Sequence, residues 1–137
     1  MRVTTKGRYA LRAIVRLTTS QDGKPVSIRT LSEIENISPE FLEQIFFKLR
    51  KDGLITSTRG PGGGFMLKKP AAKITIADVF SAVGEGLALT PCTDFGDKDC
   101  DQDKACDLHG FWDATSKYMR EYFSTITIQS VIDNMKK

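Results

Sequence analysis

A glycine-rich run between two short apolar stretches constrains the fold of this chain most strongly. The run is GPGGG at residues 60–64, and residues 54–59 and 65–69 beside it each have the composition of a β-strand. Glycine has no side chain, so such a connection forms a hairpin tip that brings backbone N–H groups close to another surface. A flexible linker is the alternative, but a linker would not be bracketed by two strands. A phosphate-binding P-loop is excluded, because no Gly-Lys-Ser/Thr follows the glycines.

Two helices joined by a tight turn are predicted immediately before this hairpin. Ser27 is a residue type that caps a helix N-terminus, and Asn36 ends that helix. Ser38 and Pro39 supply an N-cap and a first-turn proline for the second helix, which runs to residues 52–53. Its apolar stripe has i, i+3, i+4, i+7 spacing and consists of Leu42, Ile45, Phe46 and Leu49. This pair is a helix-turn-helix, and the hairpin beyond it makes a winged helix.

The charge of the chain is divided unequally between its halves. Residues 1–73 hold 14 Lys/Arg against 6 Asp/Glu, a net charge of +8, whereas residues 74–137 hold 6 against 11, a net charge of −5. An amphipathic helix is predicted from residue 7 to residue 17. Its basic face carries Arg8, Arg12 and Arg16. The asymmetry indicates that the first half meets a polyanion, although a solvated basic surface would give the same charge.

A winged helix predicts which residues contact double-stranded DNA. The second helix of the pair is expected in the major groove, where Glu43 accepts from cytosine and Gln44 pairs with adenine. Arg59 and the glycine tip are expected in the adjacent minor groove, with other cations on phosphates. The candidate DNA-binding residues are Arg2, Lys6, Arg8, Ser38, Glu40, Glu43, Gln44, Lys48, Lys51, Arg59, Gly60, Gly62, Gly63 and Lys68.

Three more helices are predicted in the second half. Residues 74–84 form an amphipathic helix with Thr75 and Asp78 in capping-box spacing, and a short helix covers residues 128–135. Residues 108–123 carry more apolar and aromatic surface than a small head could cover. A helix of this kind commonly pairs with a copy of itself, which predicts a homodimer through it.

The chain is therefore divided into three regions. Residues 1–84 are a winged helix-turn-helix DNA-binding domain, residues 85–107 a cysteine-containing loop, and residues 108–137 a dimerisation helix followed by a C-terminal helix. The expected fold class is mainly α with a small β-hairpin wing. No apolar run approaches the length of a membrane span and no secretory cleavage site follows the N-terminus, so we expect no membrane partner and no exported precursor.

All three cysteines and the only histidine lie in one polar, aspartate-rich stretch. The spacing is Cys92-x7-Cys100-x5-Cys106-x2-His109. Three cysteines cannot all pair with one another, and unpaired thiols in a polar loop favour metal ligation over a structural role. The long gaps suit an iron–sulfur cluster better than zinc, although three cysteines and a histidine are an allowed zinc set.

Two alternatives concern the same stretch. Its aspartates alternate as oxygen ligands of calcium would, but Gln102 stands where a calcium loop needs glycine and Leu108 where it needs glutamate. A calcium loop is rejected on those two positions. Without a metal, His109 would be a solvent-facing or helix-capping histidine.

With these features, the chain resembles, over nearly its whole length, the IscR-type family of winged-helix transcription regulators, which also includes NsrR-type nitric oxide sensors and cluster-free CymR-type repressors. The match rests on MRVTTKGRYALRA, FLEQIFFKLRKDGLI, RGPGGGF and the three-cysteine loop. The resemblance implies a bacterial cytoplasmic homodimer that binds palindromic promoter DNA, such as that of cluster biogenesis genes, and senses iron–sulfur status. It implies a [2Fe-2S] cluster with the ligands Cys92, Cys100, Cys106 and His109.

Two positions depart from the patterns of this family. The gap of seven residues between Cys92 and Cys100 is longer than the gap usual at this place in the family. NsrR-type members use an acidic residue near position 8 as a cluster ligand. This chain has Arg8 there, which argues against that branch.

Other classes of function explain less of the sequence. An electron-transfer protein would account for a cluster but not for the basic head, and a metal-free redox-sensing repressor would leave His109 without a role. A nitric oxide or redox-sensing regulator of the same fold, with a different cluster or none, is the alternative within the fold. Catalysis is least expected, because no nucleophile–base pair or paired-carboxylate motif is present.

Overall fold

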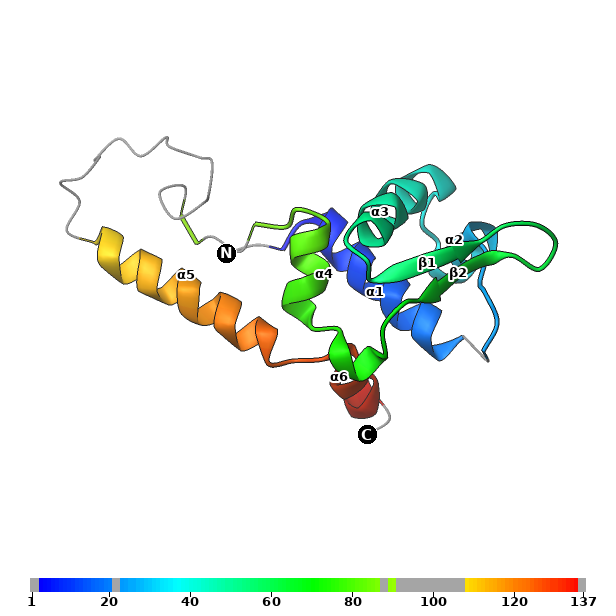
Figure 1. The fold of residues 1–137 in the computed structure, drawn as a ribbon. Coiled ribbons are helices and arrows are strands. Elements are labelled where there is room, and N and C mark those ends of the chain that lie inside the picture. Colours follow the sequence, from blue (N-terminus) through cyan, green and yellow to red (C-terminus); the bar gives the residue numbers. More distant parts are fainter. Residues whose placement is uncertain (1–2, 21–22, 87–88, 91–107, 136–137) are drawn as a thin grey trace.

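The computed structural model describes residues 3–20, 23–86, 89–90 and 108–135 (Figure 1). In chain order the elements are α1 (Thr5–Thr19), α2 (Ile28–Glu35), α3 (Pro39–Lys51), β1 (Ile55–Thr58), β2 (Gly64–Leu67), the 3₁₀ turn η1 (Ala71–Lys73), α4 (Ile76–Ala82), α5 (His109–Ser124) and α6 (Ile128–Met135). The protein is mainly helical with a β-hairpin, as predicted. None of the helices in these ranges has the length and apolar character needed to span a bilayer.

α1 is the centre of the head, the unit formed by α1–α4, β1 and β2. Ala10, Ala13, Ile14 and Leu17 of α1 are fully buried. The surrounding helices α2, α3, α4 and α6 and the strand β2 all contact α1. Burying a side chain of the size of Ile14 or Leu17 contributes about 1.5–3 kcal/mol, so the packing around α1 stabilises the head substantially.

The two helices of the predicted helix-turn-helix begin and end as expected. The Ser27 hydroxyl accepts a hydrogen bond from the Thr30 N–H at 3.1 Å at the start of α2, and Asn36 ends that helix in the left-handed conformation, with φ 55°. At α3 the Ser38 hydroxyl accepts from the Phe41 N–H at 3.2 Å. The turn between α2 and α3 is therefore defined by a left-handed asparagine and a serine cap.

The hairpin is attached to both of these helices. β1 and β2 are antiparallel, with Ile55 opposite Leu67. Val26, just before α2, exchanges backbone hydrogen bonds of 2.9 and 2.8 Å with Phe65 of β2. The Phe65 ring packs edge-on against Phe46 of α3, with ring centroids 4.9 Å apart. These contacts hold the wing at a defined angle to α3.

α4 begins with the capping box that the sequence predicts. The Thr75 hydroxyl accepts from the Asp78 N–H at 3.0 Å, and the Asp78 carboxylate accepts from the Thr75 N–H at 3.0 Å. Each side chain thus satisfies a backbone donor that the first turn of a helix leaves free.

α6 packs back against the head after α5. The Ile128 N–H donates to the Ile74 carbonyl at 2.8 Å, and the Ile76 N–H donates to the Ile126 carbonyl at 2.9 Å. Ile128 and Ile132 are buried in the core of the head. The C-terminal end of α5 is therefore fastened to the start of α4.

α5 projects away from the head (Figure 1). Ser116 is its one buried residue, and near its C-terminal end Phe123 packs edge-on against Phe80 of α4 with ring centroids 5.6 Å apart. Large apolar side chains stay exposed at the start of and along α5, namely Leu108, Phe111, Tyr118 and Tyr122. The surplus apolar surface expected for this helix is present.

Part of the positive charge predicted for the basic face of the first helix is neutralised by ion pairs with α2. Glu35, at the end of α2, accepts hydrogen bonds from Arg12 at 3.0 Å and from Arg16 at 2.7 Å. Burial raises the pKa of the Glu35 carboxyl, but the hydrogen bonds and positive charges of Arg16 and Arg12 lower it more. The pKa of Glu35 therefore lies below its ordinary value of 4.5.

Because the pKa of Glu35 is lowered on folding, its ion pairs stabilise the fold fully above pH 4.5 and progressively less as the pH falls below it. Glu35→Gln should reduce the free energy of unfolding by about 1 kcal/mol at pH 7. The difference from wild type should shrink toward zero near pH 3. Urea titrations followed by circular dichroism at several pH values measure it.

Glu33→Gln is the matched control for this experiment. Glu33 pairs with Arg29 at 3.3 Å, but both side chains are largely exposed, so its removal should change stability much less at any pH. A stability loss in Glu35→Gln that stays constant between pH 7 and pH 3 would contradict the assignment.

Candidate nucleic-acid interface

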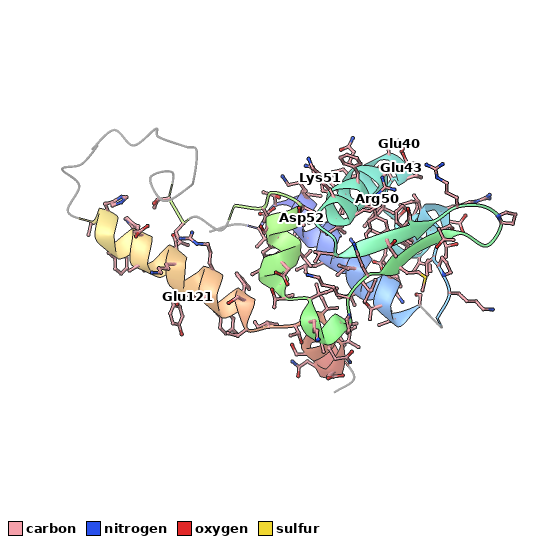
Figure 2. All side chains as sticks on the ribbon, in the orientation of Figure 1. Glu40, Glu43, Arg50, Lys51, Asp52 and Glu121 are labelled. Atoms are coloured by element: carbon pink, nitrogen blue, oxygen red, sulfur yellow. The ribbon has the colours of Figure 1, made fainter. Side chains whose placement is uncertain are left out.

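The exposed face of α3 carries the predicted base-reading residues. Burial of its apolar stripe turns the opposite face toward solvent. Figure 2 shows Glu40 and Glu43 on the outer side of α3, with Lys51 and Asp52 at the other end of the helix. The candidate residues on this surface, all exposed, are Ser38, Glu40, Glu43, Gln44, Lys48 and Lys51. Acidic groups at the start and basic groups at the end complement the helix dipole.

Lysines from two helices meet beside the C-terminal end of α3. Lys6 of α1 and Lys48 and Lys51 of α3 line an open hollow of about 300 Å³, together with Asp52 and residues 81–84. Three ammonium groups around one hollow attract an anion such as a backbone phosphate. The sequence predicts Lys6 and Lys51 as phosphate contacts and Lys48 as a DNA-binding residue, but nothing in it indicates that Lys6 joins the other two.

The tip of the wing is made of backbone with few side chains. The Gly63 N–H donates to the Gly60 carbonyl at 2.9 Å, and Gly60 and Gly62 have φ values of 96° and 75°. A Cβ at Gly63 would lie 2.3 Å from the Thr58 carbonyl oxygen, so this turn requires glycine. Arg59, at the base of the tip, is exposed.

The remaining candidate DNA contacts lie at the edges of this surface. Lys68 is exposed just after β2. Arg8 is exposed on α1, where its guanidinium donates to the Thr5 hydroxyl at 3.2 Å. Arg2 lies outside the described residues.

Glu85 makes a contact that the sequence analysis missed. Its side chain is buried, and its carboxylate accepts hydrogen bonds from the N–H of Thr4, at 2.8 Å, and from the Thr4 hydroxyl. A carboxylate at the N-terminus of α1 is favoured by the helix dipole. Gly7 makes room for it, because a Cβ there would lie 2.8 Å from a Glu85 oxygen. Glycine in the first turn of a predicted helix is the signal that could have indicated this contact.

The candidate metal ligands are described only in part. His109 is the first residue of α5 and is exposed. Cys92, Cys100 and Cys106 lie outside the described residues, and the described ranges contain no group of three or more His, Cys, Asp or Glu side chains arranged to hold a metal ion. Three thiolates and an imidazole are a donor set that fits an iron–sulfur cluster.

Comparison with known families agrees with this geometry. The Rrf2 family model, described as an iron-dependent transcriptional regulator, matches residues 3–134. The chain belongs to the Rrf2 family. This Rrf2 protein is 38% identical to the HTH-type transcriptional regulator IscR of Escherichia coli O1:K1 over 136 residues, which are 99% of this chain and 83% of that protein.

Solved structures with the same fold extend the comparison. IscR of T. potens superposes with a TM-score of 0.74 at 27% identity, covering 98% of this chain and 88% of that one. CymR, the global cysteine regulator of B. subtilis, superposes with a TM-score of 0.76 at 24% identity, covering 98% of each chain. This Rrf2 protein is thus a winged-helix transcription regulator of IscR type, and its relatives are regulators and not enzymes. The fold implies DNA as a partner.

Attachment of the wing depends on the absence of a side chain at Gly64. A Cβ there would lie 2.5 Å from the carbonyl of Val26, whereas a Cβ at Gly62 would meet nothing within 4 Å. Gly64→Ala should therefore lower the free energy of unfolding by roughly 3 kcal/mol, and Gly62→Ala by about 1 kcal/mol from its positive φ alone. Chemical denaturation measures both. Equal losses in the two variants would show that the contact with Val26 does not hold the wing.

Proposed function

We propose that this Rrf2 protein binds a palindromic operator through α3 and the wing, and that a [2Fe-2S] cluster held by Cys92, Cys100, Cys106 and His109 controls this binding. The observation that carries the proposal is the joint presence of an exposed, polar α3 face beside a basic hollow and of a separate, thiol-rich segment. In a bacterial cytoplasm, such a protein would report cluster supply to promoters, among them those of cluster biogenesis genes.

Base reading is assigned to the N-terminal half of α3. Glu43 and Gln44 are exposed there, one turn after the Ser38 cap. Glutamate accepts from the cytosine amino group, and glutamine pairs with two atoms of adenine. A carboxylate near phosphates weakens binding unless it meets a base donor, so Glu43 both selects and excludes sequences.

Phosphate contacts are assigned to the cations that surround α3. The hollow lined by Lys6, Lys48 and Lys51 lies at the C-terminal end of the helix, away from the base-reading end. Arg59 would enter the adjacent minor groove beside the glycine tip, where a narrow groove attracts a guanidinium. Lys68 and Arg8, both exposed, belong to the same proposed set of phosphate contacts, as does Arg2.

A second copy of the chain is proposed as the partner of α5. Its exposed apolar side chains, among them Phe111, Tyr118 and Tyr122, recur along one helix that projects from the head. Contiguous exposed apolar surface of this kind marks an interface between proteins. A pair related by a two-fold axis presents two α3 helices to two half-sites, which is the reason to expect a palindromic operator.

The cluster ligands are proposed from their chemistry. The three thiolates are anionic donors and the imidazole is a neutral one, and both kinds of donor bind iron. Bound there, a cluster supplies an oxidisable and removable group. His109 is exposed at the first position of α5, and because its imidazole is a neutral donor whereas the thiolates are anionic, its bond to iron would be the weakest of the four. The cluster would control DNA binding only if the protein with the cluster and the protein without it favour different positions of the two heads of the dimer.

The DNA-reading proposal is tested by comparing two substitutions on a set of operator variants. Glu43→Ala should relax discrimination at one base pair per half-site by about ten-fold or more, because a base contact is worth about 1–3 kcal/mol. Arg59→Ala should weaken binding to all variants and reduce the salt dependence. Equilibrium binding to each duplex at several salt concentrations measures both effects. The control is Asp133→Ala, which removes the same charge from an exposed position on α6, on the other side of the head from α3 (Figure 1). Unchanged base preference in Glu43→Ala would refute its assignment.

Cluster binding is tested by anaerobic reconstitution of the full chain with iron and sulfide. Wild type should develop a visible absorption spectrum, whereas Cys92→Ala should not, and His109→Ala should lose its colour faster than wild type. Asp97→Ala, in the same stretch of sequence, should behave as wild type because it is not a proposed ligand. A colourless wild type that binds one zinc ion would overturn the cluster proposal and leave the DNA-binding proposal standing.

A further inference from the structure

Phe47 is an exposed aromatic residue at the centre of the DNA-facing surface of α3. Its side chain is 59% exposed, more than that of any other large apolar residue described in the head, where Ile34 is next at 47%. Its neighbour Phe46 is fully buried and packs against Phe65. Two successive phenylalanines therefore lie on different faces of one helix, and packing in the core accounts only for Phe46.

The surroundings of Phe47 are those of a groove contact. Glu43 and Gln44 precede it by one helical turn and Lys51 follows it by one turn, so these four side chains form a continuous ridge. A protein partner covering Phe47 would have to bury the charges of Glu43 and Lys51 on either side of the ring, which is unfavourable without paired groups. Double-stranded DNA offers a partner to each of these charges, because base donors can pair with Glu43 and phosphates with Lys51.

The major groove offers one apolar group to such a ring. Among the base edges exposed there, the 5-methyl group of thymine is apolar, and phenylalanine is one of the side chains that contacts it. We propose that Phe47 is a specificity-determining residue that packs against a thymine methyl group of the operator, next to the bases contacted by Glu43 and Gln44. This inference rests on the proposed function, because it requires α3 to lie in the major groove.

The test deletes the methyl group from the DNA and the ring from the protein. An operator is first obtained by selecting random duplex DNA with the full-length chain. Each thymine of one half-site is then replaced in turn by deoxyuridine, which lacks only the methyl group. Wild type should lose roughly four-fold in affinity at one position, the equivalent of one buried methyl group, and nothing at most others. Phe47→Ala should bind the thymine operator about four-fold more weakly and show no further loss on the uridine duplex.

Two further variants separate a base contact from a structural effect. Phe47→Leu should keep part of the sensitivity to deoxyuridine, since leucine still presents an apolar surface. Ile34→Ala removes the other exposed apolar side chain of the head and should keep the full sensitivity. Circular dichroism should show that all three variants fold, as expected for exposed positions.

The outcomes distinguish this inference from the proposed function. If an operator is selected and no thymine position is sensitive in wild type, or if Phe47→Ala keeps the sensitivity, the role of Phe47 is refuted while DNA reading stands. If random DNA yields no enriched sequence, DNA reading itself fails. A parallel series with 5-methylcytosine in place of cytosine identifies the source of the methyl group, and sensitivity confined to that series would refute the assignment to thymine.

Discussion

The apolar stripe that α3 buries sets the rotation of this helix about its axis, and that rotation decides which of its side chains are exposed. Leu42, Phe46 and Leu49 are fully buried against the head. Because a helix has only one rotation that buries such a stripe, Glu43 and Phe47 have to face solvent on the other side. A helix rotated by one residue would bury a carboxylate, which costs several kcal/mol unless it is paired. Burial of apolar surface thus decides which side chains of α3 are exposed, without any energetic contribution from those side chains themselves.

The wing depends on the same core, since the edge-on contact between Phe46 and Phe65 joins strand and helix. The backbone hydrogen bonds between Val26 and Phe65 attach the wing at a second place and do not depend on side chains. α3 and the wing are therefore held by one cluster of contacts, which fixes the position of the hairpin relative to the helix. On the surface, the same packing brings a lysine of α1 and two lysines of α3 to the rim of one hollow and so concentrates positive charge there.

Local signals account for most of what was predictable from the sequence. Ser27, Ser38 and Thr75 act on backbone donors within three residues, so their caps can be read from spacing alone, and each is confirmed. The contacts of Glu35 with Arg12 and of Glu85 with Thr4 join residues far apart in sequence, 23 and 81 positions respectively, and no local pattern announces them. The metal ligands and the DNA contacts stay predictions. Their residue types indicate which chemistry they could perform, but only the positions of the bound cluster and the bound DNA would test that assignment.

Both ends of the stretch between Glu85 and Ile126 are fastened to the same body. The Glu85 carboxylate accepts hydrogen bonds from Thr4, the residue just before α1, and the Ile126 carbonyl accepts one from the N–H of Ile76 at the start of α4. Within this stretch α5 is about 24 Å long at 1.5 Å per residue, and the hydroxyl of its buried Ser116 accepts a hydrogen bond from the Leu89 N–H at 3.2 Å. Because α5 meets the head near its C-terminal end, where Phe123 packs against Phe80, a tilt of α5 about that end would move its outer tip through a larger distance than its base.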